Sequence, residues 1–310
     1  MKKRYLLLIP VAACIIVCAA AIGYIQFHPE RAPEGAAFLA RAVQEKQDTG
    51  SGEEEQQEEP AEQPEELTAA QKRAQELVDS MTLEQKLYQM MFVTPEVLTD
   101  STNNVVRAGD STKESITATP VGGILYTSRN LQGKDQTSVM LNNTQQYARE
   151  AGAGIPVFTG IAEEGGSHAP AASVLGTAAV EDMSVYGQTN NPEEVRDIGK
   201  TLAAAISGVG FNMNFAPVAD VLTNPENQVV KKRSFGTDPQ VVSDMCQAVA
   251  EGLTESGIYA TYKHFPGHGM TSTDTHAGYA YSDKTLEELE SCELIPFQKG
   301  IADGISFVMV

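Results

Sequence analysis

Cysteine and basic residues are both scarce in this chain. Only four of its 310 residues are cysteines; two lie in an apolar leader, and Cys246 and Cys292 fall in expected helices. Four scattered cysteines argue against a disulfide framework, so we expect Cys246 and Cys292 to behave as small buried hydrophobic residues. The 22 lysines and arginines face 41 aspartates and glutamates, and the resulting formal charge of −19 argues against a nucleic-acid partner.

Residues 28–68 lack the side chains from which a hydrophobic core is built. Within 51–66 there are eight glutamates, three glutamines and two prolines, and no aromatic or β-branched residue. Such a composition cannot bury enough apolar surface to offset the entropy lost on ordering, so we expect a disordered Glu-rich linker. An acidic interaction tail is the alternative, and a spacer that holds a domain away from a membrane is the simpler interpretation.

Residues 1–27 have the pattern of a signal peptide or membrane anchor. Three basic residues precede an apolar run of 21 residues, from Tyr5 to Ile25, which is long enough to span a bilayer. Small residues at 19–21, within this run, offer a place where a signal peptidase could cut. An uncleaved anchor and a cleaved secretion signal both stay open, with a lipoprotein signal third. In each case we expect an extracytoplasmic protein, membrane-anchored or secreted.

The remaining segment, 69–310, alternates expected strands and helices. Short β-branched and aromatic runs predict six strands, and helix-like stretches with Ser, Thr or Pro in the first turn separate them. Strands that alternate with helices form parallel βα units, which build an open doubly wound sheet or a barrel. The expected strands are 90–93, 121–126, 155–161, 211–216, 259–264 and 305–310, and the expected helices are 70–78, one beginning at 80–86, 135–150, 192–207, 239–256 and 286–302.

One stretch, Lys263–His276, concentrates titratable side chains. It reads KHFPGHGMTSTDTH and holds three histidines, one lysine and one aspartate in 14 residues. Pro266 and the two glycines near it end the preceding strand and force a loop. Polar side chains on a loop at the carboxyl end of a strand are typical of an α/β active site.

Three interpretations of this loop compete. The first is a histidine-rich surface loop without function. The second is a metal site, since three histidines and an aspartate are suitable ligands, although Pro266 breaks the helix that a pair such as His264 and His268 needs. The third is acid–base chemistry, in which Asp274 lies against one ring nitrogen of His276 and leaves the other free for proton transfer.

The sequence KHFPGHG followed by Asp-x-His closely resembles the β-N-acetylglucosaminidases of glycoside hydrolase family 3. Weaker matches follow the family's order between Ser80 and Val310. The resemblance implies an α/β fold, a (β/α)8 TIM-type barrel, that fills 69–310. The matching pieces are SMTLEQK at 80–86, GGIL at 122–125, EGG at 164–166, NFAPVADV at 214–221 and RSFG at 233–236.

The resemblance also implies a catalytic pair. His276 would protonate the leaving glycosidic oxygen and later activate water, while Asp274 would orient its ring. A histidine in this role departs from the two-carboxylate scheme that is usual for glycosidases. No metal or organic cofactor is implied.

Five further residues receive roles from the same resemblance. Lys263, His264 and Arg233 would bind sugar hydroxyls, Arg233 through its fixed fork of donors. Glu164 would support the sugar-binding residues without contacting the sugar itself. Asp220, expected at the end of a strand, would support them too, and capping of a loop is the alternative for this residue.

Two features depart from the family's pattern. The family usually has an aspartate in place of Ala162 and arginines in place of Ser167 and, in many members, Pro170. Some of the side chains that bind the sugar in the family are therefore missing here. The family's nucleophile is an aspartate beyond the strand expected at 305–310. We therefore expect a fragment whose barrel is open after about six strands.

These observations predict a retaining exo-β-N-acetylhexosaminidase that acts on amino-sugar glycans such as cell-wall fragments. Its expected partners are the glycan and, through the leader, a membrane. Activity would depend on the missing nucleophile. The alternative is a catalytically impaired glycan-binding or wall-associated barrel protein, and a metal-dependent hydrolase is the third hypothesis.

Overall fold

The computed structural model describes residues 67–276 and 278–310. The prediction of a signal or anchor at 1–27, and that of a linker at 28–68 up to residue 66, lie outside these residues. Within the described part, no helix combines the length and apolar character needed to cross a membrane.

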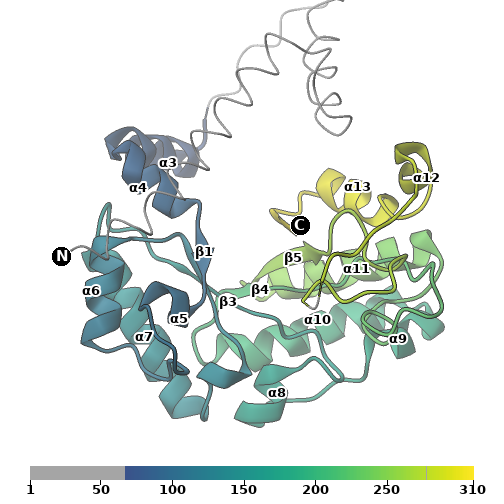
Figure 1. The fold of residues 1–310 in the computed structure, drawn as a ribbon, viewed down its shortest axis with the longest axis horizontal. Coiled ribbons are helices and arrows are strands. Elements are labelled where there is room, and N and C mark those ends of the chain that lie inside the picture. Colours follow the sequence, from purple (N-terminus) through teal and green to yellow (C-terminus); the bar gives the residue numbers. More distant parts are fainter. Residues whose placement is uncertain (1–66, 277) are drawn as a thin grey trace, which may run out of the picture. The chain divides into compact units, whose positions relative to one another are not determined.

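Six parallel strands form one sheet in the order β1-β2-β3-β4-β5-β6 (Figure 1). Each strand pairs with the next one in the chain, as where Gly123 lies opposite Phe92 and Phe307 opposite Thr261. Because the strand order never reverses, every connection runs in the same direction. The sheet therefore curls like half a barrel and is not doubly wound. The strands are β1 (Phe92–Val93), β2 (Gly123–Leu125), β3 (Phe158–Ile161), β4 (Met213–Asn214), β5 (Tyr259–Lys263) and β6 (Phe307–Met309).

Helices cover the outer side of the curled sheet (Figure 1). Two of them, α10 and α11, approach so closely that a Cβ at Gly199 would lie 2.5 Å from the carbonyl oxygen of Val249, and one at Gly252 would lie 2.1 Å from that of Arg196. The contact therefore requires glycine on both helices. The helices are α3 (Ala69–Ser80), α4 (Leu83–Gln89), α5 (Pro95–Leu98), α6 (Asp110–Ala118), the 3-10 turn η2 (Ser128–Asn130), α7 (Lys134–Glu150), α8 (Pro170–Leu175), α9 (Met183–Thr189), α10 (Pro192–Ser207), α11 (Pro239–Glu255), α12 (Leu286–Glu290) and α13 (Ile295–Ala302).

The main hydrophobic core lies between the sheet and these helices. Ile124 and Ile161 contribute from the strands, and Leu141, Leu202 and Met245 from the helices, all with almost no exposed surface. Burial of this kind is the main stabilising force of such a layered fold. The inner side of the sheet is more open.

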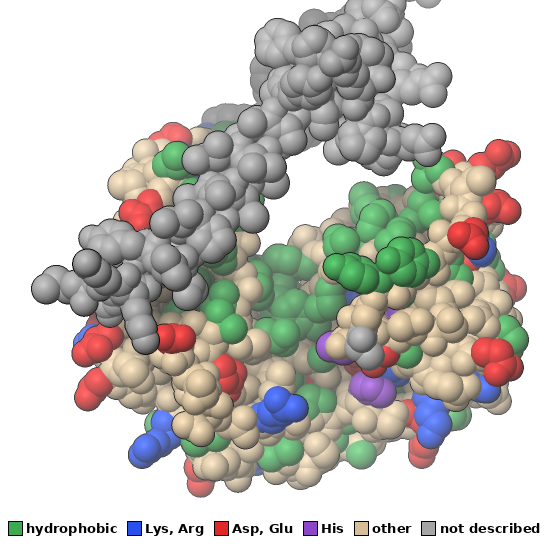
Figure 2. Space-filling model, in the orientation of Figure 1, with side chains coloured by type: hydrophobic (Ala, Val, Ile, Leu, Met, Phe, Trp, Pro, Cys, Tyr) green, Lys and Arg blue, Asp and Glu red, His purple; other side chains and the backbone are tan. Residues whose placement is uncertain are grey.

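Aromatic rings gather on the sheet along the first residues of its strands. The rings of Phe158 and Phe307 lie 5.3 Å apart and those of Phe158 and Tyr259 5.4 Å apart, both edge to face. Phe92, Met213 and Phe307 line a groove on this side. Figure 2 shows hydrophobic side chains gathered in the hollow on the open side of the sheet.

All six predicted strands are present, each shorter than predicted, and the prediction of 192–207 as a helix is confirmed. The sequence patterns missed four short helices, α5, α6, α8 and α9. They lie in the connections that follow β1 and β3. Their length explains the omission, because a helix of two turns carries too few residues to show a periodic pattern.

The prediction of one continuous helix over 286–302 is wrong. The structure divides it into α12 and α13, with Pro296 in the first turn of α13. Proline has no N–H to donate to the preceding turn, so it begins a helix instead of continuing one. Cys292 consequently lies in the turn between the two helices and is half-buried, whereas Cys246 is fully buried in α11.

Candidate active site

The predicted site residues follow the carboxyl ends of three neighbouring strands. Glu164 lies just after β3, Asp220 follows β4 on the chain, and Lys263 is the last residue of β5. The carboxyl ends of parallel strands meet at one edge of a sheet, where loops from different strands can share a site. These three residues, far apart in the sequence, are thereby brought together.

Glu164 is the centre of a buried cluster with two cations. Arg233 donates from Nε to Oε2 over 2.6 Å and from Nη2 to Oε1 over 2.7 Å, a bidentate pair. The ammonium of Lys263 lies 2.5 Å from Oε1 of the same carboxylate. The exposed fractions of the three side chains are 3% for Glu164, 4% for Lys263 and 12% for Arg233, so water screens this cluster very little.

The three charged groups of this cluster shift one another's pKa values. Burial alone would raise the pKa of Glu164, but Lys263 and Arg233 outweigh it and hold the pKa at about 2. Burial opposes the charge of Arg233 as well, and Glu164 more than compensates, so the pKa of Arg233 is raised. For Lys263 burial prevails and lowers the pKa, because Glu164 is shared with a second cation. The carboxylate is therefore firmly ionised.

Asp220 fixes the loop that follows β5. Its Oδ2 lies 2.7 Å from Nδ1 of His264, and its Oδ1 accepts the backbone N–H groups of His264 at 3.2 Å and of His268 at 2.6 Å. This fully buried carboxylate takes three donors, all from the loop after β5, as the loop-capping alternative for Asp220 expects. Its bond to Nδ1 leaves Nε2 of His264 as an acceptor, and Nη2 of Arg233 lies 3.4 Å from it. The two carboxylate centres are thus joined through Arg233 and His264.

His268 is part of the interior of the same loop. Its Nδ1 lies 2.5 Å from Oγ1 of Thr271, and its carbonyl accepts from Nδ2 of Asn227 over 2.8 Å. Burial lowers the pKa of the ring, which is consistent with a neutral imidazole. Its Nε2 is buried without a hydrogen-bond partner among the described residues. Neither Thr271 nor Asn227 was predicted as a site residue, and their side chains hold the loop in place.

Asp274 and His276 form the predicted i, i+2 pair. Oδ1 of Asp274 is 2.9 Å from both the backbone nitrogen and Nδ1 of His276. The backbone N–H of His276, and then its ring, lower the pKa of Asp274. In contrast to the buried cluster, the side chains of His276 and Asp274 are 93% and 47% exposed. The structure forms the pair but shows no hydrogen bond between it and Glu164, Lys263 or Arg233 within the described chain.

Glu163 is a buried carboxylate that the sequence patterns missed. Its two oxygens accept the N–H groups of Ala171 at 2.6 Å and Ala172 at 3.1 Å, in the first turn of α8. Its own backbone is held by the amide of Asn214, which accepts from its N–H and donates to its carbonyl, both over 2.9 Å. Burial raises the pKa of Glu163. Pro170, suited to a first helical turn, was the one sequence signal of this arrangement.

The metal interpretation of the loop finds no support in the geometry. Across the residues that the structure describes, no group of three or more His, Cys, Asp and Glu side chains is arranged to hold a metal ion. His268 is directed to Thr271, and His264 is directed to Asp220. Nδ1 of each of these two rings therefore already has a protein partner.

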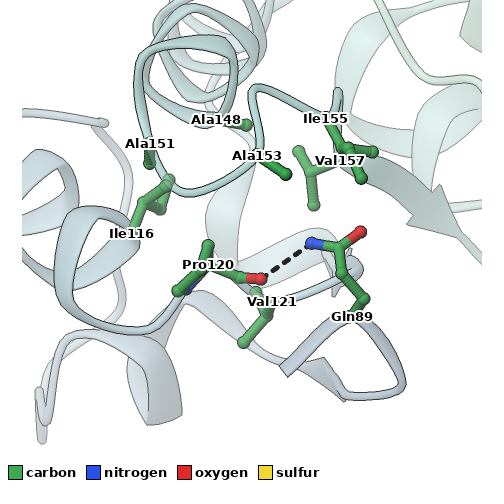
Figure 3. A pocket seen from close by; sticks show the side chains of 9 residues that line it. All are labelled: Gln89, Ile116, Pro120, Val121, Ala148, Ala151, Ala153, Ile155 and Val157. Atoms are coloured by element: carbon green, nitrogen blue, oxygen red, sulfur yellow. Dashed lines mark hydrogen bonds between the residues drawn. The ribbon is translucent and has the colours of Figure 1, made fainter. Parts of the chain in front are cut away.

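An apolar pocket lies elsewhere, as Figure 3 shows. Val121 and Val157, which line it, precede β2 and β3, so it lies at the amino ends of these strands. Gln89 closes one side by donating to the carbonyl of Pro120 over 2.8 Å. The candidate site lies at the opposite, carboxyl ends, where Figure 2 shows histidine side chains close together.

Comparison with known proteins identifies the family of the described part of the chain. The model of the glycosyl hydrolase family 3 N-terminal domain matches residues 82–310. The β-hexosaminidase LpqI of Mycobacterium tuberculosis is 30% identical over 205 residues, which are 66% of this chain and 51% of that protein. The β-hexosaminidase A of Pseudoalteromonas piscicida is 30% identical over 59% of this chain and 31% of its own length. The chain spans about half the length of these curated relatives, or less.

Solved structures show the same fold. A family 3 β-N-acetylglucosaminidase from Paenibacillus sp. FPU-7 superposes with a TM-score of 0.67 and 32% identity, covering 74% of this chain and 42% of that one. A β-N-acetylhexosaminidase from Beutenbergia cavernae superposes with a TM-score of 0.62 and 27% identity, covering 74% of this chain and 66% of that one.

Proposed function

The chain belongs to glycoside hydrolase family 3, and on that premise we propose that it is a retaining exo-β-N-acetylhexosaminidase. Its substrates would be terminal N-acetylglucosamine-type residues of amino-sugar glycans, such as cell-wall fragments. One observation supports this proposal above the others: Glu164, Arg233 and Lys263 form a buried, charged cluster beside the loop that carries the Asp274–His276 pair.

Arg233 and Lys263 have hydrogen-bond donors to spare for the sugar. Glu164 uses two N–H groups of the guanidinium, and Nη1 makes only a long contact of 3.4 Å with the carbonyl of Val229. Lys263 uses one proton of its ammonium on the same carboxylate, and such a group has three. The ion pairs hold both cations in place, so little side-chain freedom is lost when a sugar hydroxyl binds.

In the proposed reaction His276 is the acid and the base. Asp274 accepts from Nδ1–H, so Nε2 is the nitrogen that exchanges a proton with the substrate. The imidazolium first donates its Nε2 proton to the leaving glycosidic oxygen. The neutral ring then takes a proton from water as this water attacks the glycosyl-enzyme. Asp274 stays a carboxylate throughout and stabilises the imidazolium.

Retention requires a carboxylate nucleophile on the other face of the sugar, as in two-carboxylate enzymes. Activity is measured on the natural full-length protein, the product of the full reading frame. We also propose the family's eight-stranded barrel for the fold, which the curl and unbroken order of the six described strands support. An extracytoplasmic location, anchored or secreted, rests on the apolar run from Tyr5 to Ile25.

A second candidate is glycan binding without hydrolysis. It is favoured by the contrast between the tightly held Arg233 and the fully solvated ring of His276. The absence of a polar side chain at Ala162, where the family usually has an aspartate, points the same way.

Hydrolysis of 4-nitrophenyl glycosides distinguishes the two candidates. The proposal predicts release of nitrophenol from the N-acetyl-β-glucosaminide, with a kcat/KM at least about 100-fold above that for the β-glucoside, because a site that hydrogen-bonds an amide group rejects the analogue without it. Calorimetric binding of N-acetylglucosamine without turnover would favour the binding protein. Absence of both would overturn both candidates.

A further inference from the structure

A histidine outside the predicted site residues lies next to the buried cluster. His168 is exposed, and the positions of its neighbours are fixed by a tight turn after β3. The N–H of Glu164 donates to the carbonyl of His168 over 2.8 Å, and the N–H of His168 donates to that of Gly165 over 3.0 Å. The turn therefore ties His168 directly to the residue at the centre of the site.

The ring of His168 is held by a relay from Asp182. Oδ1 of Asp182 accepts the N–H of Ser167 over 2.9 Å and its hydroxyl over 3.1 Å. Asp182 stands at the N-cap of α9, but its side chain makes no capping hydrogen bond to that helix, and its carboxylate bonds to this turn instead. A Cβ at Gly166 would lie 2.0 Å from Oδ1, and only glycine allows this approach.

The relay determines which nitrogen of His168 carries the proton. Because the Ser167 hydroxyl donates to Asp182, its oxygen is left to accept from Nδ1 of His168, 3.2 Å away. A neutral ring then has a bare Nε2, which is an acceptor. Partial burial lowers the pKa of His168, and although Glu164 opposes this, Arg233 and Lys263 add to it. The ring is therefore kept neutral at neutral pH.

The buried carboxylates at this edge are already used as acceptors. Each oxygen of Glu164 accepts from Arg233 or Lys263, and both oxygens of Asp220 have donors. The corresponding nitrogen of His268 is buried, and that of His264 faces Arg233. Among the described residues no partner occupies Nε2 of His168. A sugar hydroxyl donates one hydrogen bond and accepts others, so a site rich in cationic donors also needs an acceptor.

We propose that Nε2 of His168 accepts a hydrogen bond from a hydroxyl group of the terminal amino sugar, and that Ser167 and Asp182 set the tautomer that makes this contact. This role rests on the proposed function. It makes His168 a substrate-contacting residue that selects for the hydroxyl, while Ser167 and Asp182 are positioning residues.

Three variants separate this role from a structural one. His168→Phe keeps a ring without the acceptor, His168→Gln keeps an acceptor, and Ser167→Ala removes the partner of Nδ1. We expect His168→Phe to lower kcat/KM for the N-acetyl-β-glucosaminide about 3- to 10-fold, the effect of one neutral hydrogen bond. His168→Gln should recover most of this loss, and Ser167→Ala should fall between them.

Deoxy substrates identify the donor. Glycosides that lack one hydroxyl each, and one without the acetamido N–H, are compared in wild type and His168→Phe. For one hydroxyl position, wild type should lose the same factor as the variant loses on the parent glycoside, and the variant should lose nothing more. Nitrogen NMR of the free protein should show His168 protonated on Nδ1, and Ser167→Ala should weaken that preference.

Each outcome is decisive. If wild type cleaves the parent glycoside and His168→Phe matches it on every substrate, the role of His168 is overturned and the proposed function stands. If the acetamido analogue alone shows the coupling, the donor is not a hydroxyl and the proposal is wrong as stated. If wild type neither binds nor cleaves any N-acetylglucosaminide, the proposed function fails and this inference fails with it.

Discussion

Glu164 and Arg233 are 69 residues apart in the chain and meet through two parallel hydrogen bonds, of 2.6 Å and 2.7 Å. Lys263 closes on the same carboxylate from the end of β5. Two of the side chains come from the connections after β3 and β4 and the third from the end of β5, so their contact depends on the correct assembly of the carboxyl edge. Removing the carboxylate would leave two buried cations without a partner, which is costly in a poorly solvated interior.

Glu164→Gln should therefore destabilise the fold. A pKa of about 2 in the folded protein, against a reference value of 4.5, corresponds to about 3 kcal/mol of the free energy of unfolding at pH 7. Urea unfolding of the variant should show a loss of this order. Glu150→Gln is the matched control, since it breaks an exposed pair with Lys113 and should leave the unfolding midpoint close to that of wild type.

The same ion pairs predict a dependence on pH. The pKa of Glu164 is depressed in the folded state, so its contribution is complete above about pH 4.5 and is lost as the pH falls toward 2. The difference in unfolding free energy between wild type and Glu164→Gln should shrink over this range. A difference that stays constant from pH 7 to pH 3 would show that the carboxylate charge is not its cause.

The layered fold could be predicted from sequence because its signals are local. The 16-residue pattern of α10 and the strands around it gave the right elements, and their alternation gave parallel pairing. Two errors in the predicted helices have physical causes. A continuous helix-like stretch at 286–302 concealed the break before Pro296, and short helices such as α8 carry too few residues to show a period.

The candidate site was predictable only in part. KHFPGHG and the Asp-x-His pair lie close together in the chain, so the sequence and its family resemblance could nominate Lys263, His264 and the Asp274–His276 pair as candidate site residues. It could not show that Glu164 is the shared partner of two cations, because that contact joins two loops and a strand end that are distant in the sequence. The burial of His268 was equally hidden, since it depends on Asn227, 41 residues earlier in the chain.

His276→Ala should slow catalysis by the product of the full reading frame. Loss of a general acid and base typically costs about 10²–10⁴-fold in rate. Substrates with poor leaving groups should suffer most, and with good leaving groups the glycosyl-enzyme should accumulate. Rapid-mixing release of nitrophenol measures both steps. Thr275→Ala, on the same exposed turn, is the control and should keep wild-type rates.

Asp274→Asn tests whether the negative charge of Asp274 assists His276 in proton transfer. Asparagine keeps the size of the side chain and can still accept from Nδ1, but it cannot stabilise the imidazolium by charge. The rate should fall by no more than in His276→Ala, and the alkaline limb of the pH–rate profile should move to lower pH. An unchanged profile would mean that Asp274 serves only the shape of the loop.

His268→Ala should act on stability more than on chemistry. The ring is buried against Thr271, and its loss leaves a cavity that costs roughly 1–3 kcal/mol, while the Thr271 hydroxyl keeps its bond to the backbone carbonyl of residue 268. Rates on good and poor leaving groups should change by the same factor. A loss confined to poor leaving groups would instead make His268 a proton donor and contradict the assignment to His276.

Proton NMR of the sugar as it is released tests the central claim most directly. The product of the full reading frame is mixed with 4-nitrophenyl N-acetyl-β-glucosaminide, and the anomeric signals are followed before mutarotation mixes them. A retaining β-N-acetylhexosaminidase releases the β anomer first, and the α anomer appears only as the sugar equilibrates. Initial release of the α anomer, or no release of N-acetylglucosamine, would contradict the account.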